Sequence, residues 1–256
     1  CECDANDLLV ELARLSTVFV KPEIGPNYQT LEGPDDINLA FPYDYALHLI
    51  KAPEAWELTH GDSSIRIAIS DAGYIFSHPE LSNKVDVISS NIVHSNTAHG
   101  TAVAIAAAGA TNNSYGKSSV GYHSRLELRG MNYNELLEAS YSGARIVNAS
   151  WAASCFYSDY GQQIINEIYN NGTVIVAAAG NGSTCGGAAN YVYPAAFEHV
   201  ISVTSVGPSD NHERTIGNPS TTHQHNDRVD LCAPGYDVLL STANGVYLTG
   251  NGSSFA

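Results

Sequence analysis

The sequence predicts an α/β fold, with a mostly parallel sheet covered by helices on both faces. Short apolar segments recur along the chain, helical patterns lie between them, and polar residues follow several of the apolar segments. We expect strands at 65–70, 85–88, 126–128, 146–149, 174–178 and 200–206. Apolar strands that alternate with helices are typical of parallel sheets buried on both faces. In such sheets, functional residues gather at the carboxyl ends of the strands.

The helices are expected between these strands. A short helix at 52–58 has Pro53 near its start, where proline is favoured. Residues 99–108 form a run of small residues that can pack closely against a sheet, and 134–142 and 161–169 have helical spacing of apolar residues. These elements form one α/β domain over 44–256.

Residues 1–43 differ from this pattern. Residues 7–15 have helical spacing with Asp7 as a cap, and four prolines fall between 21 and 42. The segment is interpreted as an N-terminal arm or the remnant of a pro-segment.

Composition limits the classes of partner. The chain has 256 residues, of which 44% are hydrophobic and 14% charged, so it is long enough and apolar enough to bury a core. A formal net charge of −15 argues against nucleic acid and anionic membrane surfaces as partners. No apolar run reaches the length of a membrane span.

Cysteine positions bear on the compartment. Cys155 and Cys185 flank one strand–loop region and suit a disulfide, which would imply an oxidising environment, although two buried thiols are the alternative. Cys232 lies in an apolar run and is predicted to be a core residue. Cys1 suits either a lipid-carrying N-terminus or an arbitrary chain start. An extracellular or cell-surface location, with a possible lipid anchor at Cys1, follows as an expectation.

Four polar residues fit the requirements of acyl transfer as a set. Asp71 follows a strand, His99 opens a helix, Asn181 follows another strand, and Ser254 lies on a Gly- and Ser-rich turn. Taken singly, they suit a turn cap, a structural histidine, a turn asparagine and a flexible tail. Together they supply an orienting acid, a base, an oxyanion donor and a nucleophilic hydroxyl. A base that must stay neutral would tolerate a helix start, where the dipole disfavours imidazolium.

An ordered set of motifs carries a more specific signal. The chain resembles the subtilisin-like serine peptidases from about residue 50 to its end. The matching segments are Ile67-Ala68-Ile69-Ser70-Asp71-Ala72-Gly73, His78-Pro79-Glu80-Leu81, His99-Gly100-Thr101, Asn148-Ala149-Ser150, Ala177-Ala178-Ala179-Gly180-Asn181, Tyr193-Pro194-Ala195-Ala196, Ala233-Pro234-Gly235 and Gly252-Ser253-Ser254-Phe255-Ala256.

The resemblance implies a three-layer subtilisin-like fold and a role for each candidate. Asp71 would orient His99, His99 would take the proton of Ser254, and Asn181 would hold the oxyanion. An extended peptide or protein substrate would bind along two segments and beside a specificity pocket, through Ser150, Trp151, Ala152, Gly130 and Val192.

The chain departs from the family pattern near these sites. Ser70 replaces an apolar residue before the aspartate, Trp151 and Ala152 replace a smaller pair, and Phe255 stands where methionine is common. Val192 is expected to narrow the first specificity pocket. These changes affect substrate preference and remove no catalytic atom.

Metal binding is a weaker expectation, and no cofactor is required for the chemistry. Residues 111–116 resemble the family's calcium loop, with Glu80 and Asn113 as candidate ligands, but a plain turn is equally compatible with them. His223-Gln224-His225 has no Cys or acid at ligand spacing and is interpreted as a solvated loop.

The resemblance also predicts that a buried helix should follow Ser254. We therefore expect the rest of the domain to be supplied by further residues or by a second polypeptide. The leading functional hypothesis is a serine endopeptidase. A non-catalytic peptide-binding or assembly subunit and a serine hydrolase acting on esters are the alternatives.

Overall fold

The computed structural model describes residues 33–37, 44–92, 97–209, 222–243 and 246–256. Their centre is a seven-stranded parallel sheet in the order β2-β3-β1-β4-β5-β6-β7. The strands are β1 (Arg66–Ser70), β2 (Val85–Ile88), β3 (Arg125–Arg129), β4 (Ile146–Ala149), β5 (Val174–Ala178), β6 (Val200–Val206) and β7 (Leu231–Pro234). A separate antiparallel hairpin joins β8 (Val238–Ala243) and β9 (Val246–Gly250).

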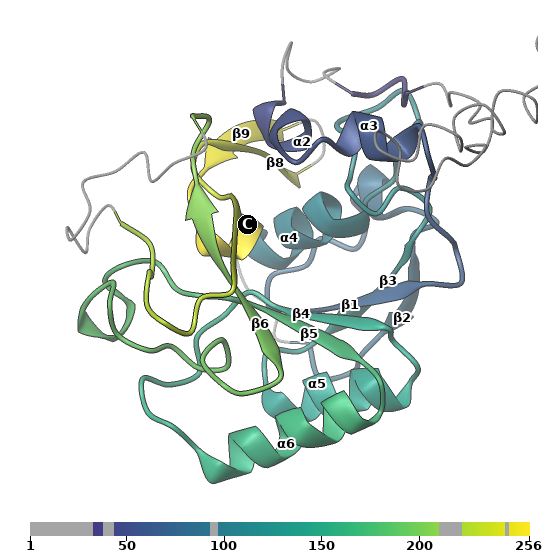
Figure 1. Ribbon diagram of the computed structural model, residues 1–256. Helices are drawn as coiled ribbons and strands as arrows, with labels where there is room; N and C mark the ends of the chain where they lie inside the picture. The colour runs from purple at the N-terminus through teal and green to yellow at the C-terminus, as the bar shows by residue number, and fades with distance from the viewer. Residues whose placement is uncertain (1–32, 38–43, 93–96, 210–221, 244–245) are drawn as a thin grey trace, which may run out of the picture.

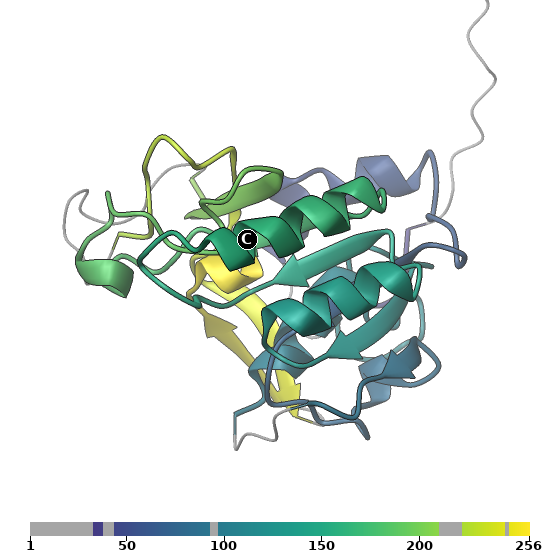
Figure 2. The ribbon, with the colours of Figure 1, turned by 90° about the horizontal axis from the view of Figure 1, so that it is seen from below.

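Helices lie on both faces of the sheet, as predicted. α4 (His99–Ala108) lies on one face, and α5 (Tyr133–Tyr141) and α6 (Asp159–Asn170) lie on the other (Figures 1 and 2). α2 (Tyr45–Leu49) and α3 (Ala52–Trp56) lie near α4, and short 3-10 turns cover Pro79–Leu81, Thr184–Gly186 and Ser253–Phe255. Among the described helices, none is long and apolar enough to cross a bilayer.

Strand alternation divides the core into two layers. In β1, Ala68 packs with α5 and α6, whereas Ile67 and Ile69 face α4. α4 is apolar on nearly all sides and mostly buried, except that its half-buried residues Ala106 and Ala107 line an open groove. α6 is amphipathic and buries Ile164, Ile165 and Ile168 against the opposite face. Sequence periodicity thus determines which face each segment covers.

The predicted boundaries agree with these elements to within about two residues. The strands at 85–88, 146–149, 174–178 and 200–206 and the helix at 99–108 are confirmed without change. α2, β7 and the β8–β9 hairpin were not anticipated. The predicted helix at 7–15 and most of the proline-rich stretch lie outside the described residues.

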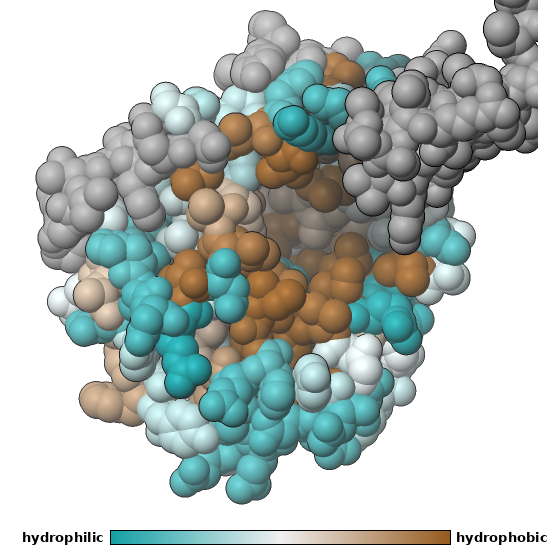
Figure 3. Space-filling view, viewed as in Figure 1, coloured by the Kyte–Doolittle hydropathy of each residue, from teal (hydrophilic) through white to brown (hydrophobic). Residues whose placement is uncertain are grey.

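One part of the α4-side sheet face remains open. An apolar groove of about 340 Å³ runs over β1, β4 and β5 beside α4, and Figure 3 shows its hydrophobic floor. It is lined on the sheet by Ile67, Ile146, Asn148 and Val176, on α4 by Val103, Ala106 and Ala107, and near Ser254 by Phe255 and Ala256.

Candidate active site

Asp71 and His99 form a directly bonded pair. The main chain of Asp71 continues β1, because its N–H donates to Arg129 O, and its side chain is buried. Its two carboxylate oxygens lie 2.8 and 3.0 Å from His99 Nδ1. His99 is the first residue of α4, so the helix fixes its backbone. This contact assigns Nδ1 to the carboxylate and leaves Nε2 as the nitrogen for proton transfer.

The same pair raises the pKa of His99. The hydrogen bond and the charge of Asp71 favour imidazolium, and partial burial opposes them without reversing the shift. The effect of Asp71 is opposite to that of the helix start, where the dipole disfavours imidazolium. A base with a raised pKa is a stronger proton acceptor, which suits general-base catalysis.

Ser254 lies beside this pair but is not bonded to it. Its Oγ–H donates to Ser150 O at 3.2 Å, and Ser150 Oγ donates back to Ser254 O at 2.9 Å. The ring of the next residue, Phe255, lies 5.6 Å from that of His99. The fold thus brings Ser254 to the edge where Asp71 and His99 lie, but its hydroxyl is directed to Ser150 rather than to His99.

Asn181 follows β5 at the same edge, and a neighbour of Ser254 orients its amide. Asn181 Oδ1 accepts hydrogen bonds from Ser253 N and Ser253 Oγ, both at 2.9 Å. Gly180 has a φ of 118°, which favours glycine, and its N–H donates to Ser253 Oγ. Because the amide oxygen is occupied, the NH₂ group of Asn181 is the end available to an oxyanion. Ser253 was not singled out from the sequence, although its place before Ser254 was a usable signal.

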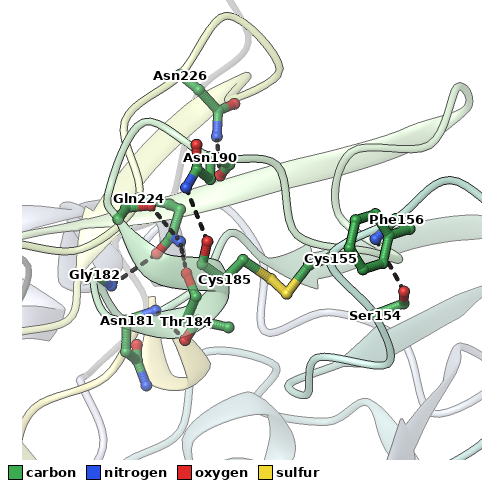
Figure 4. The surroundings of a disulfide bond; sticks show 11 residues. Ser154, Cys155, Phe156, Asn181, Gly182, Thr184, Cys185, Asn190, Gln224 and Asn226 are labelled. Carbon is green, nitrogen blue, oxygen red and sulfur yellow. Dashed lines mark hydrogen bonds between the residues drawn. A yellow bond between two sulfur atoms is a disulfide. The ribbon is translucent and has the colours of Figure 1, made fainter.

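Gln224 is a second functional candidate that sequence reasoning missed. Its buried side chain accepts from Gly182 N at 2.7 Å and donates to Thr184 O at 2.8 Å, so it holds the loop after Asn181 (Figure 4). Its neighbour His223 is also buried and contacts Ser205 Oγ, which contradicts the predicted solvated loop. Gln224 packs against the Asn181 loop, but the sequence around it has no periodic pattern from which this packing could be predicted.

A disulfide connects the loop after Asn181 to the chain that follows the predicted substrate residues Ser150–Ala152. Cys155 and Cys185 are bonded, with their Cα atoms 5.2 Å apart (Figure 4). Cys232, in contrast, is a free and exposed cysteine, so its prediction as a core residue was wrong. It lies on β7, the edge strand of the sheet, which leaves one side of the strand uncovered.

The predicted substrate residues lie around this edge. Gly130 and Ser150 follow β3 and β4, the two neighbours of β1. Trp151 is largely buried, whereas Ala152 is exposed. Val192 is buried, and a Cβ on Gly180 would lie 3.0 Å from it, so Val192 borders the Asn181 loop.

The predicted calcium loop is closed by hydrogen bonds. Glu80 is fully buried, its Oε1 accepts from Lys117 N at 3.0 Å, and its Oε2 accepts from Asn113 Nδ2 at 3.4 Å. Asn113 Oδ1 accepts from Tyr115 N, as in an ordinary Asx turn. Over the described residues, no cluster of three His, Cys, Asp or Glu side chains suits a metal ion. These oxygens do not form an open cage, and calcium binding stays a prediction.

Comparison with known proteins places the chain in a family. Residues 62–256 match the model of the subtilase family of peptidases. The chain is 30% identical over 230 residues to a thermophilic serine proteinase of Bacillus sp. (strain AK1), covering 84% of this chain and 54% of that protein. It is 32% identical to thermitase of Thermoactinomyces vulgaris, covering 83% of this chain and 77% of that one. The chain thus spans about half of the first relative and about three quarters of the second.

Other relatives and solved structures agree with this placement. A halolysin-like extracellular serine protease, Nep of Natrialba magadii, is 29% identical over 91% of this chain and 45% of its own length. A protease of Pseudoalteromonas arctica has a similar fold, with a TM-score of 0.69, 22% identity, and coverage of 88% of this chain and 84% of that one. The prenylagaramide maturation protease PagA gives a TM-score of 0.66 at 20% identity, with coverage of 80% and 75%. The motifs, the parallel sheet and these matches together show that the chain belongs to the subtilase family.

Proposed function

We propose that this chain is a serine endopeptidase that cleaves peptide bonds through an acyl-enzyme. The observation that carries the proposal is the buried Asp71 carboxylate bonded to His99 Nδ1, at the sheet edge that also holds Ser254 and Asn181. The relatives named as serine proteases support the same reaction class.

The residues take the following roles in the proposed reaction. Ser254 Oγ leaves Ser150 O, rotates toward His99, gives its proton to Nε2 and attacks the substrate carbonyl carbon. Asp71 stabilises the imidazolium that forms, and the NH₂ group of Asn181 donates to the developing oxyanion. His99 then protonates the leaving amine. Water, deprotonated by the same nitrogen, hydrolyses the ester at Ser254.

An extended peptide is the proposed substrate. The backbones at Gly130 and at Ser150–Ala152 follow β3 and β4, the two strands that flank β1, and a peptide added between them would pair as an extra strand. Val192, beside Gly180, would restrict the side chain next to the scissile bond. The disulfide and the extracellular relative Nep support a location outside the cell. Cys1 lies outside the described residues, and its lipidation stays a prediction.

Covalent labelling tests this function directly. A fluorophosphonate probe should modify Ser254, and peptide mapping should locate the adduct there. Ser254→Ala should abolish labelling, whereas Ser253→Ala, one residue earlier, should slow it without abolishing it. Folded protein that takes up no label would contradict the proposal.

A second candidate function is favoured by one specific contact. The Ser254 hydroxyl is bonded to Ser150 O instead of His99, which is the arrangement expected of a peptide-binding subunit without turnover. Such a subunit would bind extended peptides and leave them intact. Slow hydrolysis that depends on Ser254 would exclude it.

We also propose that an apolar helix packs into the open groove. The floor of the groove consists of half-buried sheet residues, among them Ile67, Ile146 and Val176, and α4 forms one wall. Such a face stabilises a protein only when another element covers it. The helix would come either from further residues of the same polypeptide or from a second one, and it would fix the 3-10 turn that carries Ser254.

A further inference from the structure

Two departures from the family pattern, Ser70 and Trp151, meet in this structure. Ser70 ends β1 and is fully buried, and it pairs in register with Arg129 of β3 and Ala149 of β4. The next residues along those two strands are Gly130 and Ser150. Ser70 therefore lies between the two segments proposed to pair with a peptide, one residue before Asp71.

A chain of hydrogen bonds crosses this position. Trp151 Nε1–H donates to Ser70 Oγ at 3.1 Å, and Ser70 Oγ–H donates to Gly130 O at 2.7 Å. A buried indole N–H needs an acceptor, and an apolar residue at position 70 would provide none. The buried Trp151 indole thus explains why a serine is present at position 70. Together the two side chains connect the two peptide-pairing segments.

The indole of Trp151 lies in the space between those segments. Trp151 is only 9% exposed, although the residues after it are exposed. Its ring meets Tyr133 of α5 edge-on, with centroids 5.6 Å apart, and it belongs to the apolar cluster that contains Leu136 and Phe197. The side chain therefore packs inward and occupies the space in which a side pocket between the two segments would otherwise open.

We propose that Trp151, held by Ser70, is a specificity-determining residue that closes the side pocket between the two peptide-pairing segments. Alternate side chains of an extended peptide point toward the protein, and one of them would enter between these segments. There it meets the indole, so a small residue is accepted and a large one is excluded. The inference rests on the proposed peptidase function and concerns the selectivity of that site.

Replacing the indole by a smaller apolar side chain tests the proposal. The kcat/KM values of wild type and Trp151→Leu are measured on peptides with Ala or Phe at each position before the scissile bond. At one position the wild type should favour Ala, and Trp151→Leu should raise the Phe-to-Ala ratio by about tenfold or more, as opened apolar pockets do. A ratio that stays unchanged at every position would overturn the proposal.

The second tryptophan of the chain provides a matched control. Trp56 in α3 is also buried, and its indole donates to Val120 O at 3.3 Å. Trp56→Leu should lose comparable stability and keep the wild-type ratio. Ser70→Ala should loosen selectivity and raise KM more than it lowers kcat, and Ser70→Thr, which keeps a hydroxyl, should restore both. A Ser70→Ala variant with wild-type selectivity would contradict the role of Ser70.

A binding measurement separates this inference from the peptidase function. In a Trp56→Phe background, the fluorescence of Trp151 reports the binding of the same Ala and Phe peptides without turnover. Tighter binding of the Ala peptide at one position, with no labelling of Ser254, would support the pocket and refute the peptidase. Turnover together with equal affinity for both peptides would refute the closed pocket and leave the peptidase standing.

Discussion

The two halves of the candidate catalytic site differ in how firmly they are built. Asp71 and His99 stand on β1 and α4, which are buried on several sides, and they are bonded to each other. Ser254 stands on a single 3-10 turn beside an open apolar groove, and its hydroxyl is bonded to Ser150 O. The position of the base, His99, is thus fixed by β1 and α4, two elements in the first half of the sequence. The position of the nucleophile, Ser254, depends instead on what covers the groove.

The largest expected effect is on the rigid half. Asp71→Asn should lower kcat by roughly 10⁴-fold, because an amide cannot stabilise the imidazolium or hold the same tautomer. Hydrolysis of a peptide substrate measures the loss. Asp86→Asn is the control, since Asp86 pairs with Arg125 far from the site and should leave kcat unchanged. A loss below tenfold in Asp71→Asn would show that the pair does not act as proposed.

The oxyanion donor should have the next largest effect. Asn181→Ala should lower kcat by about 10²–10³-fold with little change in KM, a range known for such donors, including that of subtilisin itself. Ser253→Ala removes one of the two bonds to Asn181 Oδ1 and should cost less. Steady-state kinetics of both variants measure the two losses in kcat and any change in KM. Equal losses in kcat and in substrate affinity would indicate damage to the fold instead.

Filling the groove should affect the turn that carries Ser254 and leave the Asp71–His99 pair unchanged. A designed amphipathic helix appended after Ala256 should raise the melting temperature and increase the rate of Ser254 labelling. A helix of the same composition with its apolar residues scrambled serves as the control. Equal effects of the two helices would mean that the groove does not accept a packed helix.

A smaller effect concerns the pH dependence of stability. Burial, with the nearby charge of Asp36, raises the pKa of Glu80 to about 7 from an ordinary value of 4.5. The folded state therefore holds a proton that the unfolded state releases, so the stabilisation present below about pH 4.5 is lost as the pH rises toward 7. Glu80→Gln should flatten this decline in urea unfolding at several pH values.

The effect of calcium on stability provides a second test at Glu80. If Ca²⁺ binds at Glu80, millimolar calcium should raise the melting temperature at pH 7 relative to EDTA, and Glu80→Gln should cancel the rise. No calcium effect on the wild type would establish the hydrogen-bonded turn as the whole role of the loop.

Most strands of the sheet and the candidate site residues could be predicted from the sequence. The short apolar run of β1 and the run of small residues in α4 are local patterns, so the sequence alone was enough to place both elements. The bond between Ser70 and Trp151 joins residues 81 positions apart, and the buried Gln224 acts on a loop about 40 positions away, so neither has a local pattern. The exposure of Cys232 was missed because strand order, which makes β7 an edge, is a property of the assembled sheet.

The most direct test of the account is the rate at which a fluorophosphonate modifies Ser254, measured across pH for wild type and Asp71→Asn. The pKa of His99 is raised by Asp71, so the wild-type rate should rise with pH through one ionisation above the ordinary histidine value of 6.5. In Asp71→Asn the rate should fall sharply and its midpoint should move to lower pH. A rate independent of pH, or a midpoint that does not move, would contradict the proposal that Asp71 and His99 activate Ser254.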